Sequence, residues 1–86
     1  MFEPVRTRRT FEEAAEQIAH KVRTGDLRVG DKLPGERALA VQMEISRPTV
    51  REAVKILVDA GLLEVRRGPG GGMYVATDVV PTEVPA

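Results

Sequence analysis

The sequence predicts a mainly α-helical domain with one small β-hairpin, and three observations support this fold class. Apolar residues recur at the helical spacing of three and four in three separate stretches of the 86-residue chain. Residues that commonly begin or end helices flank each stretch. The third stretch is followed by two short apolar runs on either side of a glycine-rich turn, which is the pattern of a hairpin.

The first helix is predicted over about residues 10–24. Thr10 with Glu13 three residues later matches a capping box, and Gly25 supplies the left-handed residue that ends many helices. The apolar positions that recur at helical spacing are Phe11, Ala14, Ala15, Ile18, Ala19 and Val22.

A loop is expected between the first and second helices. Leu27, Val29 and Leu33 give the loop enough apolar content to pack, and a short strand is expected near Lys32 and Leu33. The second helix is predicted from Glu36 to about Met43, because its apolar residues are spaced helically. The Glu36 carboxylate is then favoured by the helix dipole of the first turn.

Residues 44–46 form a three-residue break before the third helix, which closes at Gly61. Ser46 is a good N-cap, and Pro48 is tolerated because N–H groups of the first turn have no partner within the helix. Two helices joined by so short a turn make a helix-turn-helix candidate. The apolar face of the third helix consists of Val50, Ala53, Val54, Leu57 and Val58.

The hairpin consists of a strand at 62–66, a turn at 68–72 and a second strand at 73–75. Three helices followed by a glycine-tipped hairpin form the plan of a winged helix-turn-helix domain. The hairpin, or wing, then covers apolar helix faces that could not bury themselves alone.

Composition excludes several classes of protein. There is no cysteine, so disulfides, thiolate catalysis and zinc fingers are excluded together. The few aromatic residues argue against a platform on which single-stranded nucleic acid stacks. No apolar stretch approaches the roughly 20 residues that span a bilayer, so we expect a cytoplasmic protein without membrane contact. We find no catalytic constellation and predict no enzyme activity, no cofactor and no metal site.

The net charge is zero, with 13 Lys and Arg against 13 Asp and Glu, which taken globally argues against a nucleic-acid binder. The charge is unevenly distributed, however. Residues 1–9 carry three basic groups against one acidic group, and residues 45–75 carry five against three. The acidic surplus lies in residues 10–44 and 76–86. A local, one-sided basic surface is therefore compatible with the neutral total.

The third helix carries the most informative cluster. Arg47, Arg51 and Lys55 follow one another at four-residue spacing and form a ridge along one side. Such a ridge at a helix N-terminus suits the major groove of DNA, where the arginine fork matches guanine O6 and N7. Ser46 and Thr49 can donate to phosphate. The alternative is a solvated helix face, which is common.

The wing carries a second basic cluster, formed by Arg66, Arg67 and Gly68. Arginines at the base of a hairpin tip could enter a minor groove, whose negative potential attracts them. A flexible turn with solvated arginines is the alternative. A nucleotide-binding glycine loop is excluded, because no helix and no Gly-Lys-Ser/Thr sequence follows the glycines.

The sequence resembles the DNA-binding domain of the GntR family of bacterial transcription regulators, and in particular its FadR-like branch. The resemblance covers residues 10–75 and rests on three motifs in order: Leu33-Pro34-Gly35-Glu36-Arg37-Ala38-Leu39-Ala40, Ser46-Arg47-Pro48-Thr49-Val50-Arg51-Glu52-Ala53, and Gly61-Leu62-Leu63 with the arginine-glycine wing. It implies DNA contacts from Arg37 at the start of the second helix and from Ser46, Arg47, Thr49 and Arg51 of the recognition helix. It also implies minor-groove contacts from Arg67 and Gly68.

Charge, periodicity and the resemblance together predict the domain organisation of a fragment of such a regulator, with a stand-alone winged helix as the alternative. Residues 1–9 are expected to be a basic N-terminal arm, residues 10–75 the winged helix-turn-helix domain, and residues 76–86 a disordered tail or a linker to a missing effector domain. The function implied is sequence-specific binding of double-stranded palindromic operator DNA by a metabolite-responsive repressor that dimerises through its C-terminal domain. The alternative is a winged-helix module that binds a partner protein instead of DNA.

Overall fold

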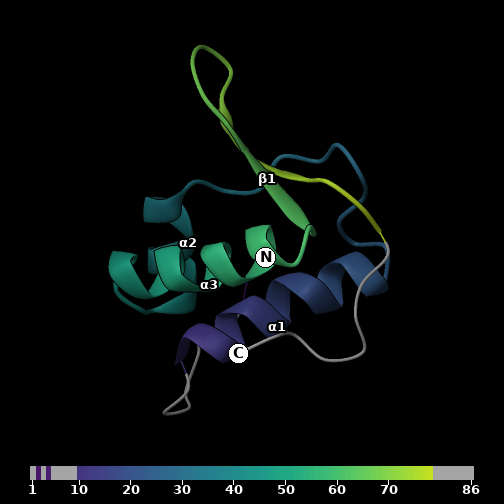
Figure 1. The fold of residues 1–86 in the computed structure, drawn as a ribbon. Helices are drawn as coiled ribbons and strands as arrows, with labels where there is room; N and C mark the ends of the chain where they lie inside the picture. The colour runs from purple at the N-terminus through teal and green to yellow at the C-terminus, as the bar shows by residue number, and fades with distance from the viewer. Residues whose placement is uncertain (1, 3, 5–9, 79–86) are drawn as a thin grey trace.

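A computed structural model describes residues 2, 4 and 10–78 of the chain. The helices are α1 (Thr10–Arg23), α2 (Glu36–Met43) and α3 (Arg47–Asp59), and a hairpin of β1 (Leu63–Arg66) and β2 (Gly72–Val75) follows them. The predicted fold class is therefore confirmed: three helices and a small antiparallel hairpin form a winged helix-turn-helix domain. Figure 1 shows the hairpin extending away from the helical body.

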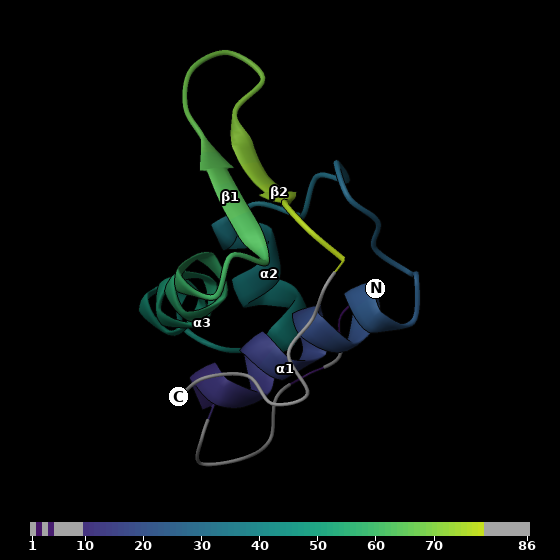
Figure 2. The ribbon, with the colours of Figure 1, turned by 45° about the vertical axis from the view of Figure 1, so that its right-hand side comes forward.

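The core lies between α1 and the helix pair α2–α3, and the base of the wing closes it. In both Figure 1 and Figure 2, α1 runs below α2 and α3 while the wing leaves the opposite side. Ile18, Leu39 and Leu57, one from each helix, are almost completely shielded from solvent. The wing contributes Leu63 and Val75 to the same core. Burying these apolar side chains is the main term that stabilises the domain.

The apolar face predicted for the third helix is correct except at its edge. Val50, Ala53, Val54 and Leu57 are buried, whereas Val58 is 37% exposed. Val58 follows Leu57 by 100° around the helix and thus turns away from the core.

In the loop before α2, the packing expected of the three apolar residues is found at two of them. Leu27 and Leu33 lie in the core, whereas Val29 is exposed.

Helix boundaries agree with the predictions to within one residue, and local signals set most of them. Gly25 and Gly61 end α1 and α3 in the left-handed conformation, at φ +84° and +81°. Ser46 caps α3, since its hydroxyl oxygen accepts a hydrogen bond from the Thr49 amide at 3.2 Å. Helix α1 begins at Thr10 itself, and the capping role predicted for Thr10 falls on a side chain outside the described ones.

The strand expected near Lys32 and Leu33 is present as a single antiparallel bridge between Lys32 and Tyr74. Three backbone hydrogen bonds tie residues 30–33 to β2: the Gly30 amide to the Val75 carbonyl (2.9 Å), the Leu33 amide to the Met73 carbonyl (2.8 Å), and the Val75 amide to the Asp31 carbonyl (3.0 Å). On its other edge β2 pairs with β1, with Leu63 opposite Val75 and Arg66 opposite Gly72. The wing is thus anchored at its base by the loop that precedes α2.

The wing tip is a tight turn over residues 68–71, closed by a hydrogen bond of 2.9 Å from the Gly71 amide to the Gly68 carbonyl. Pro69 and then Gly70 at φ +75° occupy the two central positions, which is the pattern of a type II turn. The Tyr74 hydroxyl donates to the Gly70 carbonyl at 2.5 Å. The glycines therefore build a defined turn at the end of the hairpin.

The two terminal segments are described only in part. Phe2 is buried in the core, and its amide donates to the Gln42 side-chain oxygen at 3.4 Å. The Lys21 ammonium lies 5.2 Å from the centre of the Phe2 ring. The beginning of the chain thus contributes to packing, which the expectation of a basic arm did not include. Residues 5–9 of that arm and residues 79–86 of the expected tail lie outside the described residues.

Candidate nucleic-acid interface

The basic ridge predicted on the third helix is exposed, and its first two members are fixed by a carboxylate of α2. The Nε of Arg47 donates to Glu36 Oε1 at 2.7 Å, and the Nε of Arg51 lies 3.0 Å from Glu36 Oε2. The arginine side chains remain 60% and 63% exposed, whereas that of Glu36 is 25% exposed. One carboxylate therefore holds two guanidinium groups side by side at the start of α3.

The Glu36 carboxylate is held in its charged form by these arginines. The hydrogen bond from Arg47 is the largest influence and lowers the pKa of Glu36 below its usual value of 4.5, and the charge of Arg51 acts in the same direction. Partial removal from water opposes the shift without reversing it. Glu36 is thus ionised at neutral pH, and the group formed by Glu36, Arg47 and Arg51 carries a net charge of +1.

Ser46 and Thr49 stand at the N-terminus of α3, as predicted, and their hydroxyl oxygens lie 2.7 Å apart. One hydroxyl proton is used between them, because either oxygen can be the donor of that hydrogen bond. The other hydroxyl proton remains available to an acceptor outside the protein. The pair can therefore both cap the helix and donate to an anion at its N-terminus.

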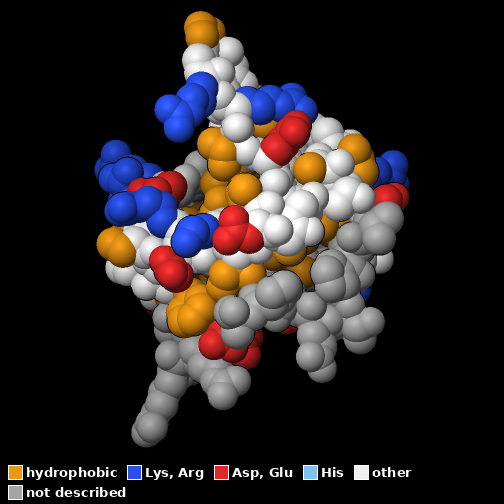
Figure 3. Space-filling model, in the orientation of Figure 1, with side chains coloured by type: hydrophobic (Ala, Val, Ile, Leu, Met, Phe, Trp, Pro, Cys, Tyr) orange, Lys and Arg blue, Asp and Glu red, His pale blue; other side chains and the backbone are white. Residues whose placement is uncertain are grey.

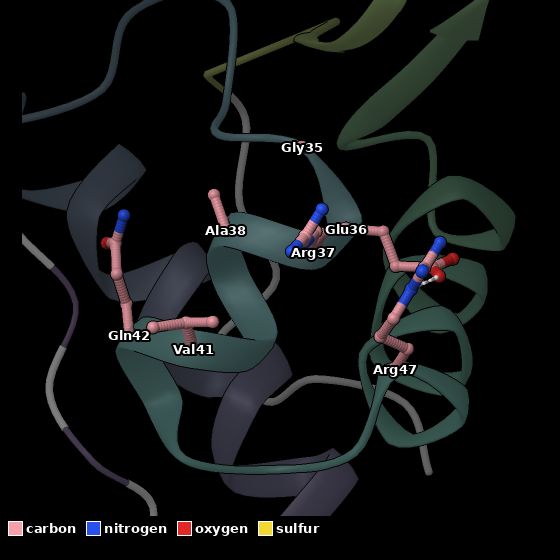
Figure 4. A pocket seen from close by; sticks show the side chains of 7 residues that line it. All are labelled: Gly35, Glu36, Arg37, Ala38, Val41, Gln42 and Arg47. Carbon is pink, nitrogen blue, oxygen red and sulfur yellow. Dashed lines mark hydrogen bonds and ion pairs between the residues drawn. The ribbon is translucent and has the colours of Figure 1, made fainter.

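Arg37 and Lys55 are exposed, on α2 and α3 respectively. Arg37 follows Glu36 in the first turn of α2, and both line a surface depression that reaches Arg47 and, along α2, Val41 and Gln42. In Figure 4 the Glu36 side chain extends toward Arg47 on α3, whereas Ala38, Val41 and Gln42 lie on the far side of the depression.

The wing cluster splits into one fixed arginine and one exposed arginine. Arg66 contacts Glu64 through Nε at 2.9 Å and Nη2 at 2.5 Å, and its guanidinium lies 4.0 Å from the centre of the Tyr74 ring. Arg67 is exposed where β1 ends, and Gly68 opens the turn at φ +84°. The structure thus places Arg67 and Gly68 nearer the tip, and Arg66 against the shaft of the wing.

The basic side chains form no single continuous patch on the face seen in Figure 3. Lys and Arg side chains gather there on the side where α2 and the start of α3 lie and again beside the wing, with Asp and Glu side chains among them. This mixture agrees with the neutral overall charge. Any attraction to a polyanion is therefore local.

Sequence reasoning missed two residues of this surface. It assigned Glu36 to the helix dipole, whereas the structure shows it bridging two arginines of another helix. Tyr74 falls in the predicted second strand without any role in the site, but its ring and hydroxyl contact Arg66 and Gly70 of the wing. No pattern within a single helix could reveal the first contact. The alternation of side chains across paired strands could have suggested the second.

The part of the chain that the structure describes contains neither a candidate metal site nor a membrane-spanning helix. Within residues 2, 4 and 10–78, no three His, Cys, Asp or Glu side chains cluster in a way that could hold a metal ion. Over the same residues, no helix has both the length and the apolar character needed to cross a bilayer.

Known proteins match this chain over the helices and the wing described above. Residues 10–75 match the family described as bacterial regulatory proteins, gntR family. The transcriptional regulator Mce2R of Mycobacterium tuberculosis is 53% identical over 66 residues, which are 77% of this chain and 28% of Mce2R. The Exu regulon transcriptional regulator of Escherichia coli K12 is 41% identical over 63 residues, 73% of this chain and 24% of that protein. The chain thus corresponds to about a quarter of the length of these curated relatives.

Solved structures show the same fold. The DNA-binding domain of AraR in complex with operator ORR3 superposes with a TM-score of 0.73 at 34% identity, covering 78% of each chain. YtrA from Sulfolobus acidocaldarius, a GntR-family transcription factor, gives a TM-score of 0.71 at 33% identity, with 80% of this chain and 70% of YtrA covered.

Proposed function

Because the chain belongs to the GntR family of bacterial regulatory proteins, we propose that its winged-helix domain binds double-stranded operator DNA by sequence and so regulates transcription. The observation that carries the proposal is the pair of exposed arginines fixed at the start of α3. Recognition helices of helix-turn-helix proteins contact base edges with their N-terminal residues. The similar DNA-binding domain of AraR is bound to an operator in its crystal structure, which supports the same role here.

The contacts proposed for the recognition helix divide into base contacts and phosphate contacts. Arg47 and Arg51 read base edges in the major groove, and a bidentate arginine–guanine contact is worth roughly 1–3 kcal/mol of discrimination. The Ser46–Thr49 hydroxyl pair, Arg37 and Lys55 hold the phosphate backbone and thereby fix the register of the helix.

The wing is proposed to contact the minor groove through Arg67 and Gly68. Two observations support these contacts. Arg67 is exposed at the end of β1, and Gly68 beside it has no side chain. Arg66 supports the wing from its shaft and contributes positive charge close to the phosphates.

The remaining organisation is proposed from the family resemblance and from the greater length of the relatives, of which the matched residues make up 28% and 24%. Residues 1–9 form a basic segment anchored to the domain by the buried Phe2, residues 10–75 the DNA-binding domain, and residues 76–86 the linker to a C-terminal domain that binds a metabolite. Two copies joined through that domain occupy a palindromic operator, because tethering raises effective concentration without new contacts. The whole protein is a cytoplasmic repressor rather than an enzyme. If the domain bound a partner protein instead of DNA, the outer face of α3 should be apolar or acidic. That face instead exposes Arg47, Arg51 and Lys55.

A salt titration of the 86-residue chain tests the proposal. The probe is a fluorescent duplex recovered by selection from a random-sequence library, and binding is followed by anisotropy. The logarithm of the association constant should fall linearly with the logarithm of salt concentration, with a slope of about −0.9 per phosphate neutralised. Replacing both Arg47 and Arg51 by alanine should reduce affinity for the selected duplex more than for a scrambled one. A chain that enriches no sequence and binds no duplex at low salt would refute DNA binding.

A further inference from the structure

We propose that Glu36 is a positioning residue that sets the base selectivity of Arg47 and Arg51. The inference rests on the proposed DNA binding and deepens it, because it assigns selectivity to a residue that need not touch a base. Three features of the structure carry it: the atoms through which the carboxylate holds the arginines, the charge of the group, and the rigid placement of Glu36.

The first feature is that Glu36 contacts both arginines through Nε. Its Oε1 lies 2.7 Å from the Nε of Arg47, and its Oε2 lies 3.0 Å from the Nε of Arg51. A guanidinium has five N–H donors, and the two terminal nitrogens form an edge separate from Nε. A bidentate contact to guanine O6 and N7 needs only such a pair of N–H groups. The contact with Glu36 therefore leaves the terminal edge of each arginine open for base readout.

The second feature is the charge of the group. Two free arginines would bring a charge of +2 to any phosphate, whereas the group with ionised Glu36 brings +1. Attraction to the backbone, which is independent of sequence, depends on how many phosphates are neutralised. Hydrogen bonds to base edges depend on geometry instead. Glu36 thus weakens binding to every duplex while leaving the base contacts intact.

The third feature is that Glu36 is placed by the packed core. It occupies the first turn of α2, which packs against α3 and has Leu39 and Ala40 buried in the core. The side chain of Glu36 is only 25% exposed, and the two arginines also hold its pKa low. The arginines are consequently ordered before DNA arrives, which reduces the rotamer freedom lost on binding.

The experiment compares the unaltered 86-residue chain with three variants that separate charge from geometry. Glu36→Gln removes the charge and one of the two acceptors. Glu36→Asp keeps the charge, and aspartate suits a first helical turn, but the side chain is one methylene too short to reach both arginines. Glu44→Gln is the matched control: it removes one negative charge from an exposed residue in the turn between α2 and α3.

Each protein is used to select duplexes from a random-sequence library, and affinity for poly(dI-dC) is measured separately. In both Glu36 variants we expect the preference at the strongest G·C positions to fall about fivefold or more, the lower end of what one bidentate contact contributes. Glu36→Gln should also bind poly(dI-dC) more tightly. Glu44→Gln should bind poly(dI-dC) somewhat more tightly and keep the base preferences of the unaltered chain.

Nitrogen-15 NMR of the arginine Nε–H groups provides a readout that a purely structural role would not change. The Nε–H signals of Arg47 and Arg51 should exchange slowly with water in the unaltered chain and rapidly in both Glu36 variants, while the backbone amide spectrum stays that of the folded domain. Unchanged base preferences in Glu36→Asp, or equal effects of Glu36→Gln and Glu44→Gln, would overturn the inference. Failure of the unaltered chain to enrich any sequence would instead overturn the proposed function itself.

Discussion

In the wing tip, adding a single methyl group at Gly71 should disturb the turn more than adding a larger side chain at the neighbouring Gly70. A Cβ added at Gly71 would lie 2.5 Å from the Arg66 carbonyl oxygen and 2.8 Å from that of Gly68, whereas ordinary contacts of a Cβ begin near 3.4 Å. Both neighbours are main-chain atoms, so Gly71→Ala cannot be accommodated by rotating a side chain. At Gly70, by contrast, an added Cβ meets nothing within 4 Å.

The magnitude follows from the hydrogen bonds that the clash would disturb. Moving the chain by nearly 1 Å would stretch the bond between the Gly71 amide and the Gly68 carbonyl and the one between the Tyr74 hydroxyl and the Gly70 carbonyl. Two such bonds contribute about 1–3 kcal/mol together. When the tip opens, the base of the wing stays packed and the backbone of the turn regains conformational entropy that offsets part of the lost bonds, so the free energy of global unfolding should fall by about 1 kcal/mol or less. The melting temperature should then fall by less than about 8 °C.

The assay combines thermal melting, amide hydrogen exchange and binding to the selected duplex. Gly71→Ala should speed exchange in residues 66–72 and weaken DNA binding while the helices stay protected. The control is Gly70→Asn, because asparagine tolerates the left-handed conformation that Gly70 adopts at φ +75°. It should retain the turn despite its larger side chain. The reasoning fails if Gly71→Ala leaves the tip as protected as before, or if Gly70→Asn disturbs it equally.

Three further predictions concern the core, a base contact and acid stability. Leu57→Ala should lower the free energy of unfolding by about 2–5 kcal/mol, because Leu57 is fully buried, whereas Val58→Ala should cost about 1 kcal/mol or less; denaturant titrations with equal losses would show that the buried face of α3 is wrongly assigned. Arg47→Ala should lose roughly 1–3 kcal/mol at one base position of the selected duplex, and a uniform loss on all sequences would make Arg47 a phosphate contact instead. Because the pKa of Glu36 is lower in the folded chain than its usual 4.5, its charge stabilises the fold above that pH, and the stabilisation disappears as pH falls through the lower folded value. The unaltered chain should therefore melt at a higher temperature than Glu36→Gln at neutral pH, and the difference in melting temperature should disappear on acidification below pH 4.5. A difference that does not change with pH would contradict this.

The parts of the fold that were predictable from sequence depend on local signals. Helical spacing of apolar residues located α1, α2 and α3, and the serine before Arg47 identified a cap that the structure confirms. The glycine-rich run located the wing turn. In each of these cases the information lies within a few residues of the chain, as the physics of helix ends and turns requires.

The features that escaped prediction depend on how separate elements meet. The contact of Glu36 with Arg47 spans 11 residues and two helices, so it exists only once α2 and α3 have packed. Phe2 lies in a short basic stretch without helical or strand periodicity, and nothing in its neighbourhood shows that the core would accept it. Glu44 ends α2 in the left-handed conformation at φ +57°, which glycine or asparagine would have signalled and glutamate does not.

The position of β1 in the wing bears on the solubility of the domain. Strand β2 is paired on both edges, by β1 and by the bridge at Lys32, so in the described part of the chain β1 presents the open edge of this small sheet. An open edge can template pairing with another molecule, and a chain of zero net charge has little overall repulsion to prevent it. Strand β1 has only four residues, and the charged Glu64 and Arg66 flank its exposed valine, Val65. Protection against aggregation is therefore local and resides in the charged side chains of β1 itself.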